Sequence, residues 1–162
     1  MSQPAEVVAA LRPAPLPMRV FVAGRARTKG SLYVVGYRPN GSAIMGEQVK
    51  GSKAWRATVA QVILRGLGAD IGPRGPVVDW EPYPGAVRVR LLTFLPRNGR
   101  AEPYPIRRTD GDTDKYQRNV GDALTDTRLI VDDAQIVEWA AVKRWAPDGQ
   151  MPGSWVEVRR VD

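Results

Sequence analysis

Apolar residues recur with a period of two in several short stretches of this chain. Between residues 86 and 95, valine and leucine alternate with Arg88 and Arg90, which predicts a half-buried strand with a basic outer face. Stretches rich in β-branched and aromatic residues predict further strands at residues 18–23, 32–37, 136–145 and 155–161. The chain therefore has enough strands for a small sheet.

Two other stretches have the three-to-four residue spacing of an amphipathic helix. Residues 53–67 place Trp55, Val59 and Ile63 on one side, and residues 114–125 show a second pattern of the same kind. Two helices of this length are enough to cover one small sheet.

Proline and glycine separate the predicted elements. Residues 38–50, 68–85 and 96–111 are rich in glycine, proline or polar residues and are predicted to be loops. Residues 1–17 end in a proline-rich run and are predicted to be a loosely held, flexible arm, because proline fixes an extended path and removes backbone donors. The remainder, residues 18–162, is long enough for one domain. We expect a single α+β domain in which a small mixed sheet is covered by two main helices.

The chain contains no histidine and no cysteine. It therefore lacks the residues that form disulfides, thiolate zinc sites, cysteine nucleophiles and Ser-His-Asp triads. Its apolar runs are far shorter than the roughly 18 residues of a membrane span, and the N-terminus lacks a signal pattern. We expect a cytoplasmic protein in which carboxylates bind any metal and perform any acid–base chemistry.

Charge is distributed unevenly along the chain, whose formal net charge is +7. Residues 1–100 contain 15 Lys+Arg against 5 Asp+Glu, whereas residues 101–162 contain 9 against 12. A basic body around a local acidic cluster is typical of a protein that attracts a polyanion and holds cations where chemistry takes place. A generic basic surface gives the same totals, so charge alone does not choose between these interpretations.

Acidic residues concentrate around the second predicted helix. On it, Asp114, Arg118 and Asp122 follow at i, i+4 and i+8 on the side opposite the apolar face, and Asp112 directly precedes the first turn. Asp133 comes just before a predicted strand that is expected to pack beside this helix. We therefore expect the carboxylates of Asp112, Asp114 and Asp133 to converge in space.

Converging carboxylates repel one another and require a counter-cation, and an all-oxygen ligand set favours Mg²⁺ or Mn²⁺. Arg118 and Lys115 are then placed to neutralise a phosphate. The simpler alternative is that an Asp-x-Asp at a helix start only caps the helix. A calcium loop of the EF-hand type is excluded, because Lys115 and Gly121 stand where that loop requires glycine and glutamate.

The spacing of these residues resembles that of the RusA family of Holliday junction resolvases, also called crossover junction endodeoxyribonucleases. The resemblance covers residues 112–135 without a gap. It consists of Asp112, Asp114, Arg118, Asp122-Ala123-Leu124 and Asp132-Asp133-Ala134-Gln135. It implies a RusA-like fold and a Mg²⁺-dependent endonuclease, common in bacteria and their phages, that acts as a homodimer and nicks opposing strands of a four-way DNA junction.

By position, the resemblance makes Asp112, Asp114 and Asp133 the metal-binding catalytic carboxylates and Asp132 their supporting partner. The family's functional lysine is replaced by Arg118, which grips phosphate but stays protonated. If the family lysine moves a proton, Lys115 on the same side of the helix is the candidate substitute.

The basic segments then form a candidate DNA-binding track. Its predicted members are Arg27, Lys29, Arg97, Arg100, Arg107 and Arg108, of which Arg107 and Arg108 lie nearest to the acidic site in sequence. The tryptophans are expected to lie in the core or at a dimer interface rather than to stack on bases, because Trp55, Trp139 and Trp155 fall within regular apolar patterns.

Two alternative functions remain open at the level of sequence. One is a nuclease that cleaves a broader range of branched DNA, such as flaps and forks. The other is a catalytically silent DNA-structure-binding protein in which the acidic cluster is a helix cap and a surface patch. Recombination, repair and processing of phage DNA are equally compatible with the residues.

Overall fold

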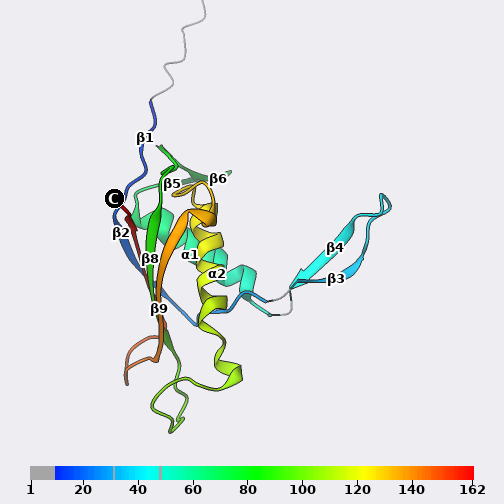
Figure 1. The fold of residues 1–162 in the computed structure, drawn as a ribbon, viewed down its shortest axis with the longest axis vertical. Coiled ribbons are helices and arrows are strands. Elements are labelled where there is room, and N and C mark those ends of the chain that lie inside the picture. The colour runs from blue at the N-terminus through cyan, green and yellow to red at the C-terminus, as the bar shows by residue number, and fades with distance from the viewer. Residues whose placement is uncertain (1–9, 31, 48) are drawn as a thin grey trace, which may run out of the picture.

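The computed structural model describes residues 10–30, 32–47 and 49–162. The strands and helices follow in the order β1 (Arg12–Pro13), β2 (Met18–Ala23), β3 (Leu32–Tyr37), β4 (Ala43–Glu47), α1 (Ser52–Gly66), β5 (Asp70–Gly72), β6 (Gly75–Val77), β7 (Trp80–Glu81), β8 (Val87–Leu95), α2 (Thr113–Asp126), β9 (Ile136–Trp145) and β10 (Gly153–Arg160). Two short 3₁₀ helices, η1 (Arg108–Asp110) and η2 (Asp133–Gln135), flank α2 in the sequence. The predicted single-domain α+β class is confirmed (Figure 1).

Four strands form the central sheet in the order β2-β10-β8-β9. β10 pairs antiparallel with β2 and β8, whereas β8 and β9 run parallel, so the sheet is mixed as predicted. Parallel neighbours need a long crossover, and here the crossover consists of residues 96–111 followed by α2. Helix α2 therefore runs back along the sheet, opposite in direction to β8 and β9.

Both helices cover the same face of this sheet (Figure 1). Val87, Val89 and Leu91 of β8 point towards the helices and are almost completely buried, while the arginines between them face away. Val156 and Val158 of β10 continue the same core. No helix among the described residues covers the opposite face of the sheet, and none is long and apolar enough to cross a membrane.

Helix α2 packs on the sheet through the side that its sequence predicted. Tyr116, Val120, Ala123 and Leu124 are all buried, because residues three and four apart share one face of a helix. The helix begins after Asp112, whose backbone is extended with φ −86° and ψ 141°. The acidic and basic residues of the opposite side therefore remain open to solvent or to a ligand.

The prediction that residues 38–50 form a loop was wrong. They contain β4, which pairs antiparallel with β3 to form a hairpin that stands out from the rest of the molecule (Figure 1). The polar and glycine residues that suggested a loop make the turn, in which Arg38 N donates to Ser42 O at 2.9 Å. Composition located the turn but not the second strand.

The prediction of a loop at residues 68–85 was also wrong in part. The segment contains the small hairpin β5–β6 and the strand β7, which pairs parallel with β1. Residues 10–17 of the predicted arm are thereby attached to the body: Arg12 Nε lies 3.0 Å from Asp79 Oδ1, and Ala14 is buried. Residues 1–9 of the arm lie outside the described residues.

Candidate functional site

The turn that leads into α2 is closely packed. Gly111 has a φ of 78°, a conformation that residues with a Cβ rarely adopt. Tyr116 Oη donates to the carbonyl oxygen of Asp110 at 2.7 Å, and Lys143 Nζ donates to the carbonyl oxygen of Gly111 at 2.6 Å. These two bonds tie the turn to α2 and to the end of β9. They fix the position at which Asp112 starts the helix.

Two candidate carboxylates lie at this helix start. Asp112 and Asp114 have side chains that are 62% and 56% exposed, and each forms an ion pair, with Lys115 at 3.1 Å and with Arg118 at 3.3 Å respectively. Exposed pairs of this kind contribute little free energy, so both carboxylates stay available to a ligand. Mg²⁺ is often held by one or two carboxylates together with water and substrate phosphate. The chemistry of this pair fits such an ion.

The third candidate carboxylate lies elsewhere along α2. A Cβ added to Gly121 would lie 3.5 Å from Cβ of Asp133, so Asp133 is beside the middle of the helix. Gly121 follows Asp114 by seven residues, which is about 10 Å along a helix axis. Among the described residues no three acidic side chains gather in a group that could hold a metal ion. The expected convergence with Asp112 is therefore not found within one chain.

The Asp-Asp-Ala-Gln motif has a structural role in this fold. Asp132 Oδ1 accepts a hydrogen bond from Ala134 N at 2.8 Å and caps η2. Gln135 Nε2 donates to the carbonyl oxygens of Tyr83 and Gly85, each at 2.8 Å. The carboxylate of Asp132, expected to support a metal ligand, is thus used as a helix cap. The motif fixes the 3₁₀ turn that carries the third candidate carboxylate.

Four of the six cations predicted to bind DNA have partners within the chain. Lys29 pairs with Asp122 at 2.6 Å, Arg97 Nε donates to the carbonyl oxygen of Arg100 at 2.7 Å, Arg100 pairs with Asp110, and Arg107 pairs with Glu102. These contacts shape the segment 96–111 and hold the segment between β2 and β3 against α2. The charges of these four residues are therefore already engaged in holding the fold.

Arg100 is the centre of the largest of these networks. Its guanidinium contacts both carboxylate oxygens of Asp110, at 2.5 and 3.1 Å, and stacks over the Trp145 ring at 4.7 Å. Glu102 accepts from both Arg100 and Arg107. Although burial opposes ionisation of Asp110, the hydrogen bonds from Arg100 and from the Arg107 amide lower its pKa. Hydrogen bonding to its own amide, and then to the two arginines, lowers the pKa of Glu102 to about 2.

We expect low pH to weaken the ion pairs of Glu102, which hold the segment 96–111, before it unfolds the sheet. The pKa of Glu102 lies at about 2 in the folded chain against an ordinary 4.5, so its contribution is complete above pH 4.5 and is lost as pH falls to about 2. The test is thermal unfolding of wild type and Glu102→Gln at pH values between 7 and 2. The wild type should have the higher Tm at pH 7, and the difference in Tm should disappear as the pH falls below about 4.5. Glu81→Gln, an exposed control, should show no such change. A difference in Tm that stays constant down to pH 2 would contradict the lowered pKa of Glu102.

Three cations near the start of α2 have no carboxylate partner in the part of the chain that the structure describes: Arg25, Arg27 and Arg108. Arg25 and Arg27 line a hollow of about 110 Å³ next to the Gly111 turn. A neighbouring hollow of about 300 Å³ is lined by Arg108, Lys115 and Asp112. Unpaired guanidinium groups around a hollow favour an anion such as phosphate.

Tyr116 and Gly111 are positioning residues: the sequence predicted Tyr116 only as part of the apolar face of α2, and it assigned no role to Gly111. Burial raises the pKa of Tyr116 to about 12, so its hydroxyl stays protonated and keeps donating to Asp110. A glycine directly before the acidic run was the available signal for the turn, but nothing local showed what packs against it. Its neighbours come from the segment around Thr28 and from β9.

Gly111→Ala is expected to destabilise the start of α2. The new Cβ would lie 2.5 Å from Thr28 Cγ2 and 3.0 Å from Tyr116 Oη, in addition to the positive φ. Gly149→Ala is the matched control, because φ is 75° there and nothing lies within 4 Å of the added Cβ. A positive φ alone costs a residue with a Cβ about 1–3 kcal/mol, so urea denaturation should show a loss of this size for Gly149→Ala and a larger one for Gly111→Ala. Equal losses would contradict the packing described.

A scan of the sequence against models of known protein families found no match, and a search among curated proteins found no relative.

Proposed function

We propose that this protein is a Mg²⁺-dependent endodeoxyribonuclease that resolves four-way DNA junctions by paired phosphodiester hydrolysis. The observation that carries the proposal is Asp112, with Asp114 two residues further on, beside hollows lined by Arg25, Arg27 and Arg108, which have no carboxylate partner among the described residues. This combination is suited to an anion that is held next to a divalent metal ion. The resemblance of residues 112–135 to RusA supports the choice of junction DNA as substrate.

The residues around the start of α2 divide into two roles in this proposal. Arg108 and Lys115 line the hollow beside Asp112 and would donate hydrogen bonds to a phosphate placed there. Arg118 would stabilise negative charge on the phosphate, and Lys115 is the candidate for proton transfer. A bound Mg²⁺ would supply a Lewis acid and lower the pKa of coordinated water. Asp112 and Asp114 would hold that ion.

Asp133 enters the proposal through a second copy of the chain. It lies beside the middle of α2, whereas Asp112 and Asp114 lie at its start. A twofold axis perpendicular to two neighbouring α2 helices makes them antiparallel, and in that arrangement each Asp133 would approach the helix start of the other copy. Val131 and Val137, each 62% exposed, flank Asp133 and would be covered by the same contact. We therefore propose a homodimer with carboxylate sets completed between copies.

Mixing two inactive variants tests the shared carboxylate set. If each set combines Asp112 of one copy with Asp133 of the other, a dimer of Asp112→Asn and Asp133→Asn contains one intact set and one doubly altered set. Refolding the variants together should then restore cleavage and divalent-ion binding, measured with Mn²⁺ by calorimetry, at one site in each mixed dimer. If each set lies within one copy, every site carries a substitution and mixing restores neither.

The nuclease proposal is tested by cleavage of labelled DNA in Mg²⁺. A four-way junction, a replication fork and a linear duplex are compared at equal concentration, and we expect paired nicks in the junction at the highest rate. Equal rates on all three substrates would replace the resolvase by a nuclease with broader structural preference. Binding of junction without cleavage, in Mg²⁺ and in Mn²⁺, would replace the enzyme by a DNA-structure-binding protein.

A further inference from the structure

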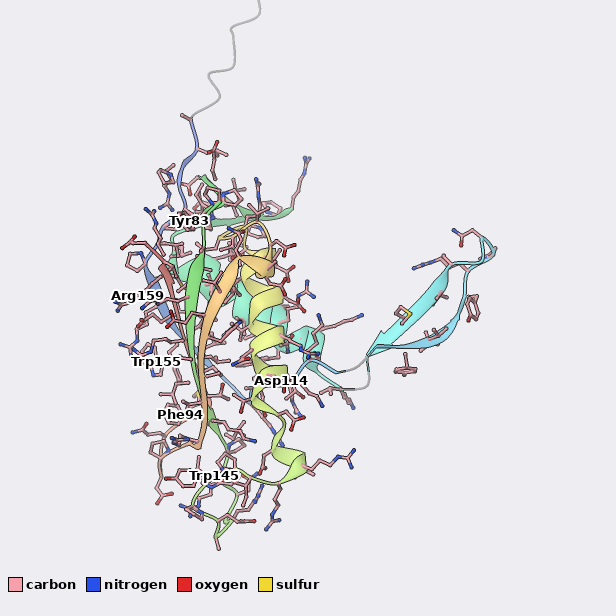
Figure 2. The ribbon with its side chains drawn as sticks, viewed as in Figure 1. Tyr83, Phe94, Asp114, Trp145, Trp155 and Arg159 are labelled. Carbon is pink, nitrogen blue, oxygen red and sulfur yellow. The ribbon has the colours of Figure 1, made fainter. Side chains whose placement is uncertain are left out.

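The face of the central sheet that the helices leave open has its own chemical pattern. The strand register places Phe21, Trp155, Leu92 and Val142 in one row across β2, β10, β8 and β9. All four side chains are only partly buried or exposed, and Phe94 lies in the next row. Figure 2 shows Trp155 and Phe94 on the side of the sheet away from the helices. An apolar and aromatic row thus crosses the whole open face.

Arginines border this row on both sides. The open face carries five arginines and two glutamates: Arg19, Arg88, Arg90, Arg144, Arg159, Glu138 and Glu157. Arg88 pairs with Glu138 at 3.3 Å and Arg159 pairs with Glu157 at 2.7 Å. The other three arginines have no carboxylate partner among the described residues. The face is therefore positive even after both of its glutamates are paired.

The excess positive charge decides which partner fits this face. A second copy would bring the same arginines against their own equivalents, and like charges facing each other disfavour that contact. A polyanion is favoured instead. Because the row between the arginines is aromatic and apolar, the polyanion should also present flat apolar groups. Single-stranded nucleic acid has both properties, since its phosphates are charged and its unpaired bases expose their π-faces.

The local geometry supports stacking. The Arg19 guanidinium lies over the Trp155 ring at 4.5 Å, and Phe21 contacts the same ring with centroids 5.2 Å apart. Bases stack both on aromatic rings and on guanidinium planes. Phe21, Trp155 and Arg19 together therefore offer a stacking surface that also carries a positive charge. A hollow of about 210 Å³ next to it is lined by Arg90, Leu92 and Trp155 among others. Arg90 lies at this hollow and has no ion pair with any of the described residues.

We infer that the open face of the sheet binds single-stranded nucleic acid, with bases on the Phe21–Trp155–Leu92–Val142 row and phosphates on Arg19 and Arg90. The face lies on the opposite side of the sheet from α2 and Asp114 (Figure 2). The inference therefore goes beyond the proposed nuclease and does not require it: a strand can bind here whether or not the helix start cuts DNA.

Fluorescence anisotropy with a labelled oligothymidylate of about 16 nucleotides, the upper end of known single-strand site sizes, tests the inference. Measurements on the full chain in EDTA separate binding from cleavage. We expect Arg90→Ala and Arg19→Ala each to weaken binding about fivefold or more, with a shallower salt dependence. Arg74→Ala removes the same charge from the exposed β5–β6 turn and should change affinity less than about twofold. Circular dichroism confirms that each variant is folded.

Each contrary outcome overturns the inference. Equal weakening by Arg74→Ala would show that overall charge, not this face, binds the strand. Equal competition by polyglutamate of matched charge would make the face a site for acidic peptides. A change of oligomeric state in Arg90→Ala, seen by light scattering without nucleic acid, would make it an interface between copies. Asp112→Asn is expected to bind oligothymidylate as wild type does, so loss of the nuclease would leave this result standing.

Discussion

Asp112→Asn is expected to slow junction cleavage in Mg²⁺ by about 10²–10³-fold, while junction affinity stays within about twofold. The amide keeps the shape of the side chain but removes the negative charge that would hold the metal ion, and metal-based stabilisation of a phosphoryl transition state is worth several kcal/mol. The side chain is exposed and does not cap α2, so the helix should persist. Single-turnover cleavage measures the rate, and anisotropy in Ca²⁺ measures the affinity.

Asp148→Asn is the matched control for this prediction. Asp148 is exposed in the turn between β9 and β10 and lines neither hollow at the start of α2, and its substitution removes the same charge. It should leave the cleavage rate unchanged. Equal losses in both variants would indicate a general electrostatic effect, and full activity of Asp112→Asn would remove the carboxylate pair from the mechanism.

Trp80→Ala is expected to lower the free energy of unfolding by about 3–5 kcal/mol, the largest stability effect of any single change considered. Trp80 is completely buried on β7, its Nε1 donates to the carbonyl oxygen of Arg128 at 3.2 Å, and the Arg12 guanidinium lies 5.2 Å from its ring centroid. The substitution would leave a cavity where β1, β7 and the end of α2 meet. Urea denaturation measures the loss.

Trp80→Phe separates the cavity from the hydrogen bond. It keeps most of the buried ring but leaves the Arg128 carbonyl oxygen without its donor, so we expect a loss of about 1–3 kcal/mol. If Trp80→Ala costs no more than Trp80→Phe, the ring does not contribute the packing described here.

Local periodicity predicted the regular elements that bury one face. The alternation at residues 87–95 and the spacing of Tyr116, Val120 and Leu124 were confirmed, because a strand and a helix each expose one face to the core whatever their neighbours are. The short strands β1, β5 and β6 were missed, as were β4 and β7. β4 directly follows the turn of the β3 hairpin, and the glycine and polar residues around it gave the composition of a loop. β7 pairs with β1, which lies far away in the sequence.

The acidic pattern predicted where the candidate carboxylates lie along the chain but not their separation. Asp112 and Asp114 start α2 and Asp133 directly precedes β9, as expected. Their distance depends on how the crossover from β8 to β9 lays α2 along the sheet. That geometry places Asp133 beside Gly121 rather than at the helix start.

The sequence also did not predict which individual arginines form ion pairs in the fold. Arg100 and Arg108 are similar in sequence context, but Arg100 pairs with Asp110 whereas Arg108 borders a hollow without a carboxylate partner in the described residues. Likewise Trp80 is buried and Trp155 lies on the open face of the sheet. Charge and hydropathy are properties of a side chain, but its partners are set by segments that meet only in the fold.

The sequence by itself determined the α+β class, the central strands, the two helices and the positions of the acidic residues, because these follow from hydrophobic period and residue type over a few neighbouring positions. Only the tertiary structure decided which cations are free, how far apart the carboxylates lie and which face of the sheet is open. Those properties depend on contacts between residues that are distant in the chain, and such contacts leave no periodic signal in either segment alone.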